Sequence, residues 1–452
     1  MGWEGCSSGV RVGRGDTMIH LAEYLQAPTR PQLALSYVAA DMEGSRILAA
    51  AYEARVLRES GVEVTDLTIG DYAPEQYCGP RELLEEIAWE VVEGRNNYPP
   101  SDGVPALQEA VRGFYAHALG VEFPAKTVVV CGGARPPIYA IFRCLVNPGD
   151  VVAYPTPSWN NDYYCQLTGA RALPLPTSAS TNFMPTPAQV RDAVSDSGVR
   201  LFCLNSPSNP CGTVIDPVTL RGITQVIVEE NISRARAGLR PLYFMFDMVY
   251  WPLAGEGNPV HPLALVPEAA PYTLYVDAVS KWLVGTGLRL GWAVVPPHLY
   301  TPLRDFMGHV GAWGPRPVQV AVAKYLSRSE EVLTFTGGLR EQVRSRQALV
   351  GASFTAWATE GLPVKHVAPT GAIYVSVRFN VIGKKTPTGN VLDSNTAIRR
   401  YLLNEARVAL VAFQAFGMTG DTGWFRISVG AVSLAELEAG LARVREALLL
   451  LK

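Results

Sequence analysis

The chain is poor in the residues that build disulfide frameworks and metal sites. Its seven cysteines are scattered over 452 residues, none forms a Cys-x-x-Cys pair, and their odd number argues against a set of disulfides. Cys131, Cys144 and Cys203 are expected to be small core residues instead. The six histidines lack a His-Glu-x-x-His or other paired spacing, so the sequence predicts no metal site.

The chain has neither a large excess of charge of one sign nor long apolar runs. The formal net charge is −2, with no basic stripe, so no nucleic-acid partner is predicted. No run of eighteen apolar residues exists, so no segment is expected to span a membrane. Residues 1–17 lack the apolar stretch of a signal peptide and are predicted to be a disordered leader, with Met18 as an alternative start. We therefore expect a globular cytoplasmic enzyme.

What the chain does contain is a repeated alternation of short apolar runs and amphipathic stretches. Segments 81–94 and 105–119 are predicted helices, and β-branched or aromatic runs between such segments are predicted strands. This alternation is typical of βαβ units and predicts an α/β fold with a mostly parallel sheet flanked by helices. The predicted strands are 127–131, 151–154, 171–175, 201–204, 242–247, 272–277 and 291–295.

A chemically distinctive residue follows each of five of these strands. Ligands of open α/β sheets bind at the carboxyl ends of the strands, so we expect the five residues to converge on one site. They are Gly133, Trp159, Asn209, Asp247 and Lys281.

These residues suit an aldehyde cofactor that carries a phosphate. The Lys281 amine can form a Schiff base with the aldehyde, and the guanidinium of Arg289, in a Gly-rich turn, can hold the phosphate. Asp247 ends a buried strand, where a carboxylate needs a cation such as a protonated pyridine ring. The glycines after strand 127–131 open a helix whose first N–H groups form an anion cup.

In this order the residues resemble the class I/II aminotransferases, which are pyridoxal 5′-phosphate (PLP) enzymes of fold type I. Ser280-Lys281 and the Gly-x-Arg-x-Gly around Arg289 match the family's lysine motif, and the turn at Asn209 is similar to its Asn-Pro-x-Gly turn. The resemblance spans roughly residues 65 to 430. It implies a PLP-dependent aminotransferase of the aspartate aminotransferase type.

The resemblance implies a role for each residue of the cofactor site. Lys281 would hold PLP as a Schiff base and move the α-proton, and Asp247 would keep the ring nitrogen protonated. Tyr250 and Asn209 would reach the 3′ oxygen, and Trp159 would stack on the ring. The catalytic residues would be Lys281, Asp247 and Tyr250. The remaining cofactor contacts, mainly to the phosphate, would be Gly133, Ala134, Arg135, Ser280 and Arg289.

Three further positions complete the resemblance. Tyr98 matches a tyrosine that reaches the phosphate of the neighbouring subunit, which implies a homodimer. Gly70 lies in a segment that closes over the substrate, and Arg426 would bind the substrate α-carboxylate through a bidentate pair. Trp159 and Asn209 are implied substrate contacts as well.

The domain organisation follows from the same resemblance and from the predicted elements. Residues 71–325 would form a large PLP-binding domain. Residues 18–70 are predicted to be an N-terminal arm and part of a smaller, discontinuous α+β domain completed by 326–452. The elements predicted in this last segment are helices at 328–360 and 433–450, strands at 372–378, 408–412 and 425–429, and a turn-rich loop at 380–395.

The sequence departs from the family pattern mainly where the substrate side chain would lie. Ala278 stands where the family often has a serine, and segment 309–316 replaces a family segment near the partner's site. No arginine is clearly placed for a second substrate carboxylate, since Arg316 reads as a surface or interface residue. We therefore expect a pocket not built primarily for Asp or Glu, and Trp313 favours a neutral or larger substrate.

The predicted function is transfer of an amino group between an α-amino acid and a 2-oxo acid. One alternative is a fold-type I enzyme of specialised metabolism that catalyses β/γ-elimination or C–C bond formation on an amino acid such as S-adenosylmethionine. A second alternative is a ligand-binding regulator, whose usual helix-turn-helix unit the sequence does not contain. The donor, the acceptor and the pathway do not follow from the sequence.

Overall fold

The computed structural model describes residues 35–196, 198–255 and 260–452. By their contacts, the described residues up to Glu43 belong to one unit and those from Gly44 onward to a second. In the first unit the helix α1 (Tyr37–Ala40) is capped by Ser36, whose side chain accepts a hydrogen bond from the backbone of Ala39. The predicted leader at 1–17, and the predicted arm up to residue 34, lie outside the described residues.

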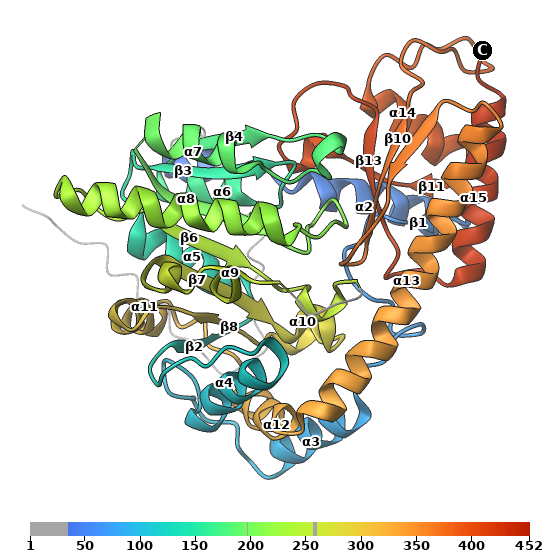
Figure 1. The fold of residues 1–452 in the computed structure, drawn as a ribbon. Helices are drawn as coiled ribbons and strands as arrows, with labels where there is room; N and C mark the ends of the chain where they lie inside the picture. Colours follow the sequence, from blue (N-terminus) through green and yellow to red (C-terminus); the bar gives the residue numbers. More distant parts are fainter. Residues whose placement is uncertain (1–34, 197, 256–259) are drawn as a thin grey trace, which may run out of the picture. The chain divides into compact units, whose positions relative to one another are not determined.

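The central sheet of the second unit contains seven strands (Figure 1), namely β2 (Val128–Cys131), β3 (Val151–Thr156), β4 (Arg171–Pro176), β5 (Val199–Asn205), β6 (Tyr243–Asp247), β7 (Thr273–Ala278) and β8 (Gly291–Val294). Their order is β2-β8-β7-β6-β5-β3-β4. Only β8 runs antiparallel to its neighbours. The mostly parallel sheet and all seven of its predicted strands are thus confirmed.

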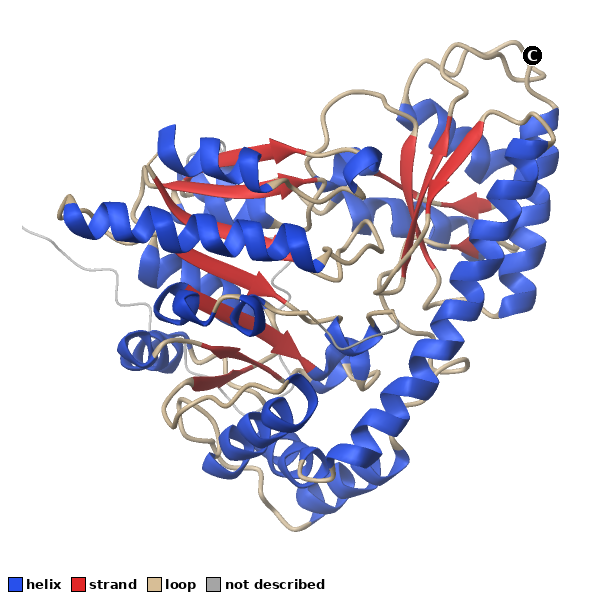
Figure 2. Cartoon of the chain, in the orientation of Figure 1, coloured by secondary structure: helices blue, strands red, loops and turns tan. Residues whose placement is uncertain are grey.

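Helices cover both faces of this sheet (Figure 2). One apolar core lies under α3 (Arg81–Val92), α4 (Pro105–Leu119), α7 (Pro187–Asp196), α8 (Pro217–Arg236) and α12 (Arg316–Leu326). The core on the opposite face lies under α5 (Arg135–Leu145), α6 (Asn161–Thr168) and α11 (Pro297–Val310). The predicted helices at 81–94 and 105–119 are confirmed as α3 and α4.

Four strands of this sheet are buried along their whole length because helices cover both faces of the sheet. Every residue of β2, β3, β7 and β8 is buried. The helix α5 begins with Arg135, followed by two prolines. Proline is tolerated there because the first N–H groups of a helix have no partner within it.

A smaller domain is built around a four-stranded antiparallel sheet of order β12-β13-β10-β9. Its elements are β9 (Val364–Val367), β10 (Tyr374–Phe379), β12 (Val411–Ala412), β13 (Trp424–Ser428), α13 (Ser329–Thr359), α14 (Asn395–Glu405) and α15 (Leu434–Leu449). The predicted helices at 328–360 and 433–450 and the strands at 372–378 and 425–429 are confirmed. No prediction covered β9 or α14.

An early segment of the chain packs on this smaller domain. The strand β1 (Thr65–Asp66) pairs in parallel with β11 (Val408–Ala409), and the helix α2 (Arg46–Glu59) contributes Ala54 to a core shared with Leu403. The smaller domain is therefore discontinuous, as predicted. The prediction of one strand at 408–412 is wrong, because β11 and β12 pair in two different sheets. The exact domain boundaries stay a prediction.

The long helix α13 connects the two domains (Figure 1). Val332, near its beginning, packs in the core of the large domain, whereas Val343, Val350 and Phe354 pack in the smaller one. The shorter helices are α9 (Pro262–Leu265), α10 (Val279–Trp282), η3 (Ala179–Thr181), η4 (Trp251–Leu253), η5 (Pro267–Tyr272), η6 (Thr286–Leu288) and η7 (Phe413–Phe416).

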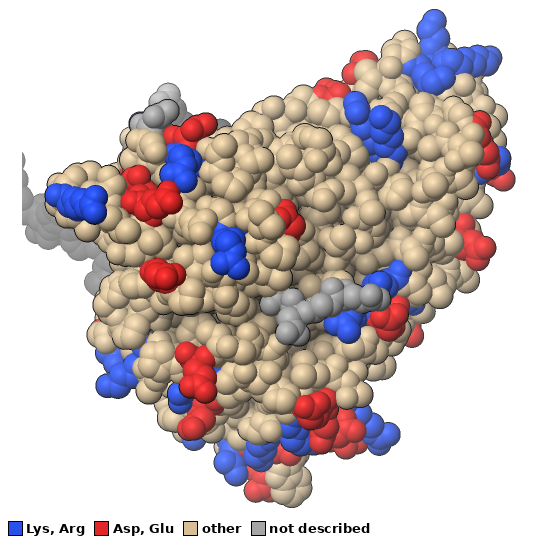
Figure 3. All heavy atoms as spheres, in the orientation of Figure 1, with Lys and Arg blue, Asp and Glu red and all other residues tan. Residues whose placement is uncertain are grey.

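Several features of the described residues bear on the predicted function classes. None of their helices is both long and apolar enough to cross a membrane. Within the same ranges, no three His, Cys, Asp or Glu residues cluster in a way that could hold a metal ion. The cysteines described are free. Cys131 and Cys203 are buried as expected, whereas Cys144, also expected in the core, is only partly buried. On the face drawn in Figure 3, positive and negative side chains are interspersed.

Candidate active site

A cavity of about 510 Å³ lies at the carboxyl ends of the central strands, with walls from both domains. Of the thirteen predicted site residues, eleven line this cavity, and Gly133 and Tyr98 do not. The eleven are Gly70, Ala134, Arg135, Trp159, Asn209, Asp247, Tyr250, Ser280, Lys281, Arg289 and Arg426. The predicted convergence of residues that follow separate strands is thus present in the structure.

The carboxylate of Asp247 lies at the end of β6 without a cation in contact among the described residues. Its Oδ1 accepts from the Val249 backbone at 3.2 Å, and its own carbonyl accepts from Asn205 Nδ2 at 3.0 Å. Asn205 Oδ1 in turn accepts from the backbone of Asn209 at 2.7 Å, which connects two of the predicted site residues. Burial raises the pKa of Asp247 to about 7. A cationic group placed against this carboxylate would keep it ionised.

The Lys281 amine projects from α10, directly after β7, and donates to the carbonyl of Gly70. Burial, together with the guanidinium groups of Arg426, Arg135 and Arg289 and against the opposing effect of Asp71, lowers the pKa of Lys281 to about 8. About a tenth of the amine is therefore neutral at pH 7. That fraction is what a nucleophilic amine or a general base requires.

An anion cup lies where β2 leads into α5. Gly133 has φ +97°, and a Cβ at this position would lie 2.7 Å from Nη2 of Arg289, so glycine is needed for both reasons. Arg289 is held by the carbonyls of Thr286 at 2.8 Å and Gly132 at 3.1 Å. Gly133 is therefore adjacent to the cavity, and its backbone leads into the first turn of α5, whose free N–H groups favour a phosphate.

Arg426 is a buried cation without a carboxylate in contact among the described residues. It is 1% exposed, donates to Asn209 Oδ1 at 3.0 Å and to the Thr68 carbonyl, and stacks between two rings. The rings are those of Tyr374 at 4.7 Å and Phe416 at 4.9 Å. Its Nε has no hydrogen-bond partner, and burial lowers the pKa of the guanidinium. An unpaired buried guanidinium of this kind fits a ligand carboxylate.

The sequence analysis missed several residues of the cavity. Arg46, at the start of α2, lines it, and the guanidinium of Arg135 lies 4.6 Å above the ring of Trp159. Arg46 was not considered for a second substrate carboxylate, because it is remote in sequence from the motifs and carries none itself. Asp71 and Tyr374 also line the cavity, and neither was assigned a role.

Tyr98, Arg316 and Trp313, which the sequence analysis singled out, lie outside the cavity lining. Tyr98 is 81% exposed, and its ring packs edge-on against Trp313 at 5.3 Å. Arg316, the weak candidate for a second carboxylate, donates to Asn97 Oδ1 at 2.6 Å and does not line the cavity either. Trp313 is likewise outside the cavity lining, so it gives no support to a large substrate.

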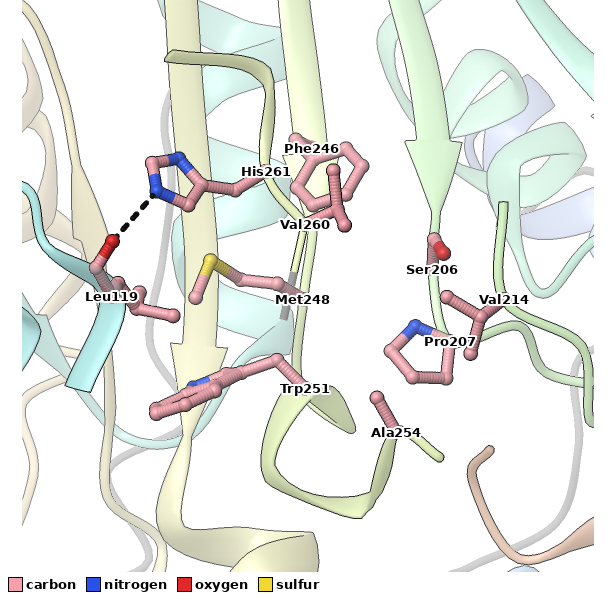
Figure 4. A pocket seen from close by; sticks show the side chains of 10 residues that line it. All are labelled: Leu119, Ser206, Pro207, Val214, Phe246, Met248, Trp251, Ala254, Val260 and His261. Carbon is pink, nitrogen blue, oxygen red and sulfur yellow. Dashed lines mark hydrogen bonds between the residues drawn. The ribbon is translucent and has the colours of Figure 1, made fainter. Parts of the chain in front are cut away.

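A second cavity is lined by residues near the ends of β5 and β6, among them Ser206 and Phe246 (Figure 4). Its lining is mostly apolar, and His261 there is engaged by the hydroxyl of Tyr275 at 3.0 Å and the carbonyl of Leu119 at 3.3 Å. The first cavity, by contrast, is lined by five cationic and two acidic side chains. It is the one that suits an anionic ligand.

Comparison with known proteins agrees with this site. Residues 62–444 match the model of the family described as aminotransferase class I and II. The chain belongs to this family.

Relatives and solved structures of the family cover most of the chain. The aspartate/prephenate aminotransferase of Thermus thermophilus is 27% identical over 83% of this chain and 90% of its own length. The aspartate aminotransferase of Pyrococcus horikoshii is 27% identical over 85% of this chain and 91% of its own length. The crystal structure of the aspartate aminotransferase from Rhizobium meliloti superposes with a TM-score of 0.83 at 26% identity, covering 92% of this chain and 99% of that one.

Membership of this family confirms three of the predictions. The fold is that of PLP enzymes of fold type I, the protein is an aminotransferase, and the cofactor is PLP. The residues of the cavity fit that cofactor. Asp247 is a carboxylate without a cation, Gly133 and Arg289 form a cup for a phosphate, and Lys281 is an amine with a lowered pKa.

Proposed function

We propose that this aminotransferase moves an amino group between an α-amino acid and a 2-oxo acid, with Lys281 as the residue whose amine bonds to the cofactor aldehyde. The observation that carries the proposal is one cavity that holds the Lys281 amine, the carboxylate of Asp247 and the unpaired guanidinium of Arg426. Amine, acid and arginine are the groups that the reaction needs for the cofactor and for the substrate carboxylate.

The residues that would hold the cofactor are those that the family resemblance assigns to it and that lie in or beside the cavity. Asp247 would face the ring nitrogen, Asn209 and Tyr250 would reach the 3′ oxygen, and Trp159 would stack on the ring. Bound PLP would supply an electron sink that weakens the bonds at the substrate α-carbon. The phosphate would be held by Gly133, Ala134, Arg135, Ser280 and Arg289.

The protein's own groups then orient the substrate and move its proton. Arg426, whose Nε has no hydrogen-bond partner, would bind the α-carboxylate and so fix the direction of the bond to be broken. The neutral amine of Lys281 would take up the α-proton and deliver it to the cofactor carbon that carried the aldehyde. Its pKa of about 8 allows both directions of transfer near neutral pH.

We propose that the amino donor carries a second anionic group. Arg46 lines the cavity in addition to Arg426, and it is not among the residues assigned to the cofactor. The relatives named aspartate or aspartate/prephenate aminotransferases are consistent with a dicarboxylate donor. A neutral donor, which the sequence alone favoured, becomes the result that would contradict this assignment.

The experiment is a panel of amino donors offered with 2-oxoglutarate to the purified holoenzyme. Appearance of the donor's 2-oxo acid together with glutamate supports transamination, and aspartate should react faster than alanine or phenylalanine. Loss of a side-chain group without formation of glutamate would favour the elimination or C–C bond-forming alternative. Preference for neutral donors would contradict the second anionic group.

Arg426 gives a second test of the same proposal. Charge-assisted hydrogen bonds contribute roughly 1.5–3 kcal/mol each, so Arg426→Ala should weaken binding of every amino donor about tenfold to a few hundredfold. Arg426→Lys should recover only part of this, because a point charge cannot make the paired contact. Unchanged donor affinity in Arg426→Ala would show that the carboxylate binds elsewhere.

We propose further that the enzyme is a homodimer in which Tyr98 reaches the partner's cavity. Tyr98 lies outside the cavity of its own chain, and its side chain is 81% exposed and so available to a second subunit. A position across a subunit interface would bury it.

A further inference from the structure

Tyr374 lies in the wall of the cavity but belongs to the smaller domain, at the start of β10. Its side chain is buried, and its neighbours are the two residues that serve the cofactor and the substrate in the proposed function. The hydroxyl lies 2.7 Å from the hydroxyl of Tyr250, and the guanidinium of Arg426 lies 4.7 Å from the centre of its ring. One side chain thus contacts both Tyr250 and Arg426.

The surroundings leave the Tyr374 hydroxyl little freedom. A Cβ at Gly70 would lie 2.5 Å from this hydroxyl, so the glycine leaves room for it. The rings of Tyr250 and Tyr374 are edge-on, with centres 5.7 Å apart and planes at 74°. Their hydroxyl groups are buried, so the bond between them does not compete with water. The pair is therefore a fixed part of the cavity wall.

The charge of Arg426 decides which of the two hydroxyl groups donates. A cation above a phenol ring makes that phenol more acidic and a better hydrogen-bond donor. Burial raises the pKa of both tyrosines, and Arg426 opposes that rise in both. The Arg426 guanidinium lies 4.7 Å from the centre of the Tyr374 ring, whereas the Lys281 amine lies 6.0 Å from the centre of the Tyr250 ring, so the closer cation acts on Tyr374. The acidic groups that act on the pair are Asp71 on Tyr374 and Asp247 on Tyr250, and each raises the pKa of its tyrosine.

We propose that Tyr374 is a positioning residue whose hydroxyl donates to the oxygen of Tyr250 and so directs the Tyr250 proton into the cavity. This inference rests on the function proposed above, in which the Tyr250 hydroxyl would donate a hydrogen bond to the 3′ oxygen of the cofactor. Tyr250 also becomes a stronger donor, because a phenol oxygen that accepts a hydrogen bond releases its own proton more readily.

The same contacts couple the substrate site to the cofactor site. A carboxylate on Arg426 neutralises the charge above Tyr374, which weakens the bond that Tyr374 donates to Tyr250. Binding of a carboxylate should therefore raise the pH at which the cofactor's visible absorbance changes. By linkage, the affinity for the carboxylate should in turn depend on pH across this titration.

The test is a pH titration of the visible absorbance of the holoenzyme for wild type and Tyr374→Phe. The phenylalanine keeps the ring beneath Arg426 and removes only the hydroxyl. A typical hydrogen bond corresponds to a shift of about half a pH unit to one pH unit, so the midpoint should rise by that amount. The matched control is Tyr401→Phe, which removes a buried hydroxyl that donates to the Ala447 carbonyl at 2.7 Å, and its midpoint should not move.

Succinate, a dicarboxylate without an amino group, serves as the probe of the coupling. It should raise the wild-type midpoint and raise that of Tyr374→Phe by less. Equal midpoints of wild type and Tyr374→Phe, or equal shifts by succinate, would overturn the role of Tyr374. If Tyr374→Phe does not fold, a wild-type midpoint that succinate leaves unchanged overturns the coupling. Absence of a titrating visible band in wild type would contradict the proposed function itself.

Discussion

At the scale of single residues, the cavity combines groups whose ordinary ionisation is opposed by their surroundings. Burial lowers the pKa of Lys281 to about 8 and raises that of Asp247 to about 7. Both shifts are costs of folding, because each group is less charged in the cavity than in water. Such costs are typical of catalytic sites, where ligands later supply the missing partner.

The shift of Lys281 predicts a pH dependence of stability in the apoenzyme. Because the folded-state pKa of about 8 lies below the ordinary value of 10.5, the unfolded chain binds more protons between these two values. Stability should therefore rise with pH across this window, and Lys281→Met should lack that rise. The difference between wild type and variant should reach up to about 1.4 kcal/mol per pH unit in chemical denaturation. Parallel pH profiles of wild type and variant would contradict the shift.

Asp247 is the second residue whose replacement should be diagnostic. Asp247→Asn keeps the shape of the side chain but removes the charge that faces the ring nitrogen in the proposed arrangement. We expect kcat to fall by about a thousandfold, or about 4 kcal/mol, while the cofactor stays bound as measured by its absorbance. Activity within tenfold of wild type would mean that the carboxylate does not face the ring.

Residues with a motif were predictable from the sequence, and residues without one were not. Lys281, Asp247 and Asn209 each follow a strand and match a family pattern, so their convergence could be predicted before the fold was known. Arg46 and Tyr374 reach the cavity only because the smaller domain and α2 pack beside the large sheet. That packing is a long-range property, and a short stretch of sequence carries no signal for it.

At the scale of elements, one buried carboxylate ties together the two turns that carry Tyr250 and Lys281. Asp277, near the end of β7, accepts from Trp251 at 2.8 Å and from Trp282 at 3.0 Å. These two tryptophans are the residues that directly follow Tyr250 and Lys281. Two further donors to the same carboxylate are the hydroxyl of Tyr115 at 2.8 Å and the backbone of Ala278 at 2.7 Å.

Removal of this carboxylate should destabilise the fold strongly. Asp277→Ala leaves two indole N–H groups and one hydroxyl buried without an acceptor, at roughly 1–3 kcal/mol for each unsatisfied group. We expect a loss of at least about 2 kcal/mol in the free energy of unfolding. Asp216→Ala, which removes the cap of α8, is the control and should cost about 1 kcal/mol. If both variants lose the same free energy of unfolding, the Asp277 carboxylate does not hold the two turns together.

The elements themselves were predictable where local periodicity decides them. All seven central strands and the helices α3, α4, α13 and α15 follow from apolar runs and amphipathic spacing. The division of segment 408–412 into β11 and β12 could not be predicted. The segment is one uniform apolar run, and nothing in it indicates that its two halves pair in different sheets. The short strand β9 is half exposed at an edge of the sheet, so its apolar signal is weak.

At the scale of the whole molecule, the proposed dimer makes each site depend on two chains. Lys281 would come from one subunit and Tyr98 from the other. Mixing Tyr98→Phe subunits with Lys281→Ala subunits should then restore activity, because each hybrid dimer contains one site with both residues intact. Activity per subunit should exceed the mean of the two separate variants. An active monomer in sedimentation would contradict the shared site, as would a mixture no more active than that mean.

The identity of the lysine that bonds to the cofactor is the central claim, and chemical trapping tests it directly. The holoenzyme is reduced with borohydride, digested, and its peptides are analysed by mass spectrometry. We predict the reduced cofactor on Lys281, and none on any lysine of a Lys281→Ala control. A trapped cofactor on another lysine, such as Lys126 or Lys324, would contradict the account, and so would holoenzyme with bound cofactor that yields no reducible adduct.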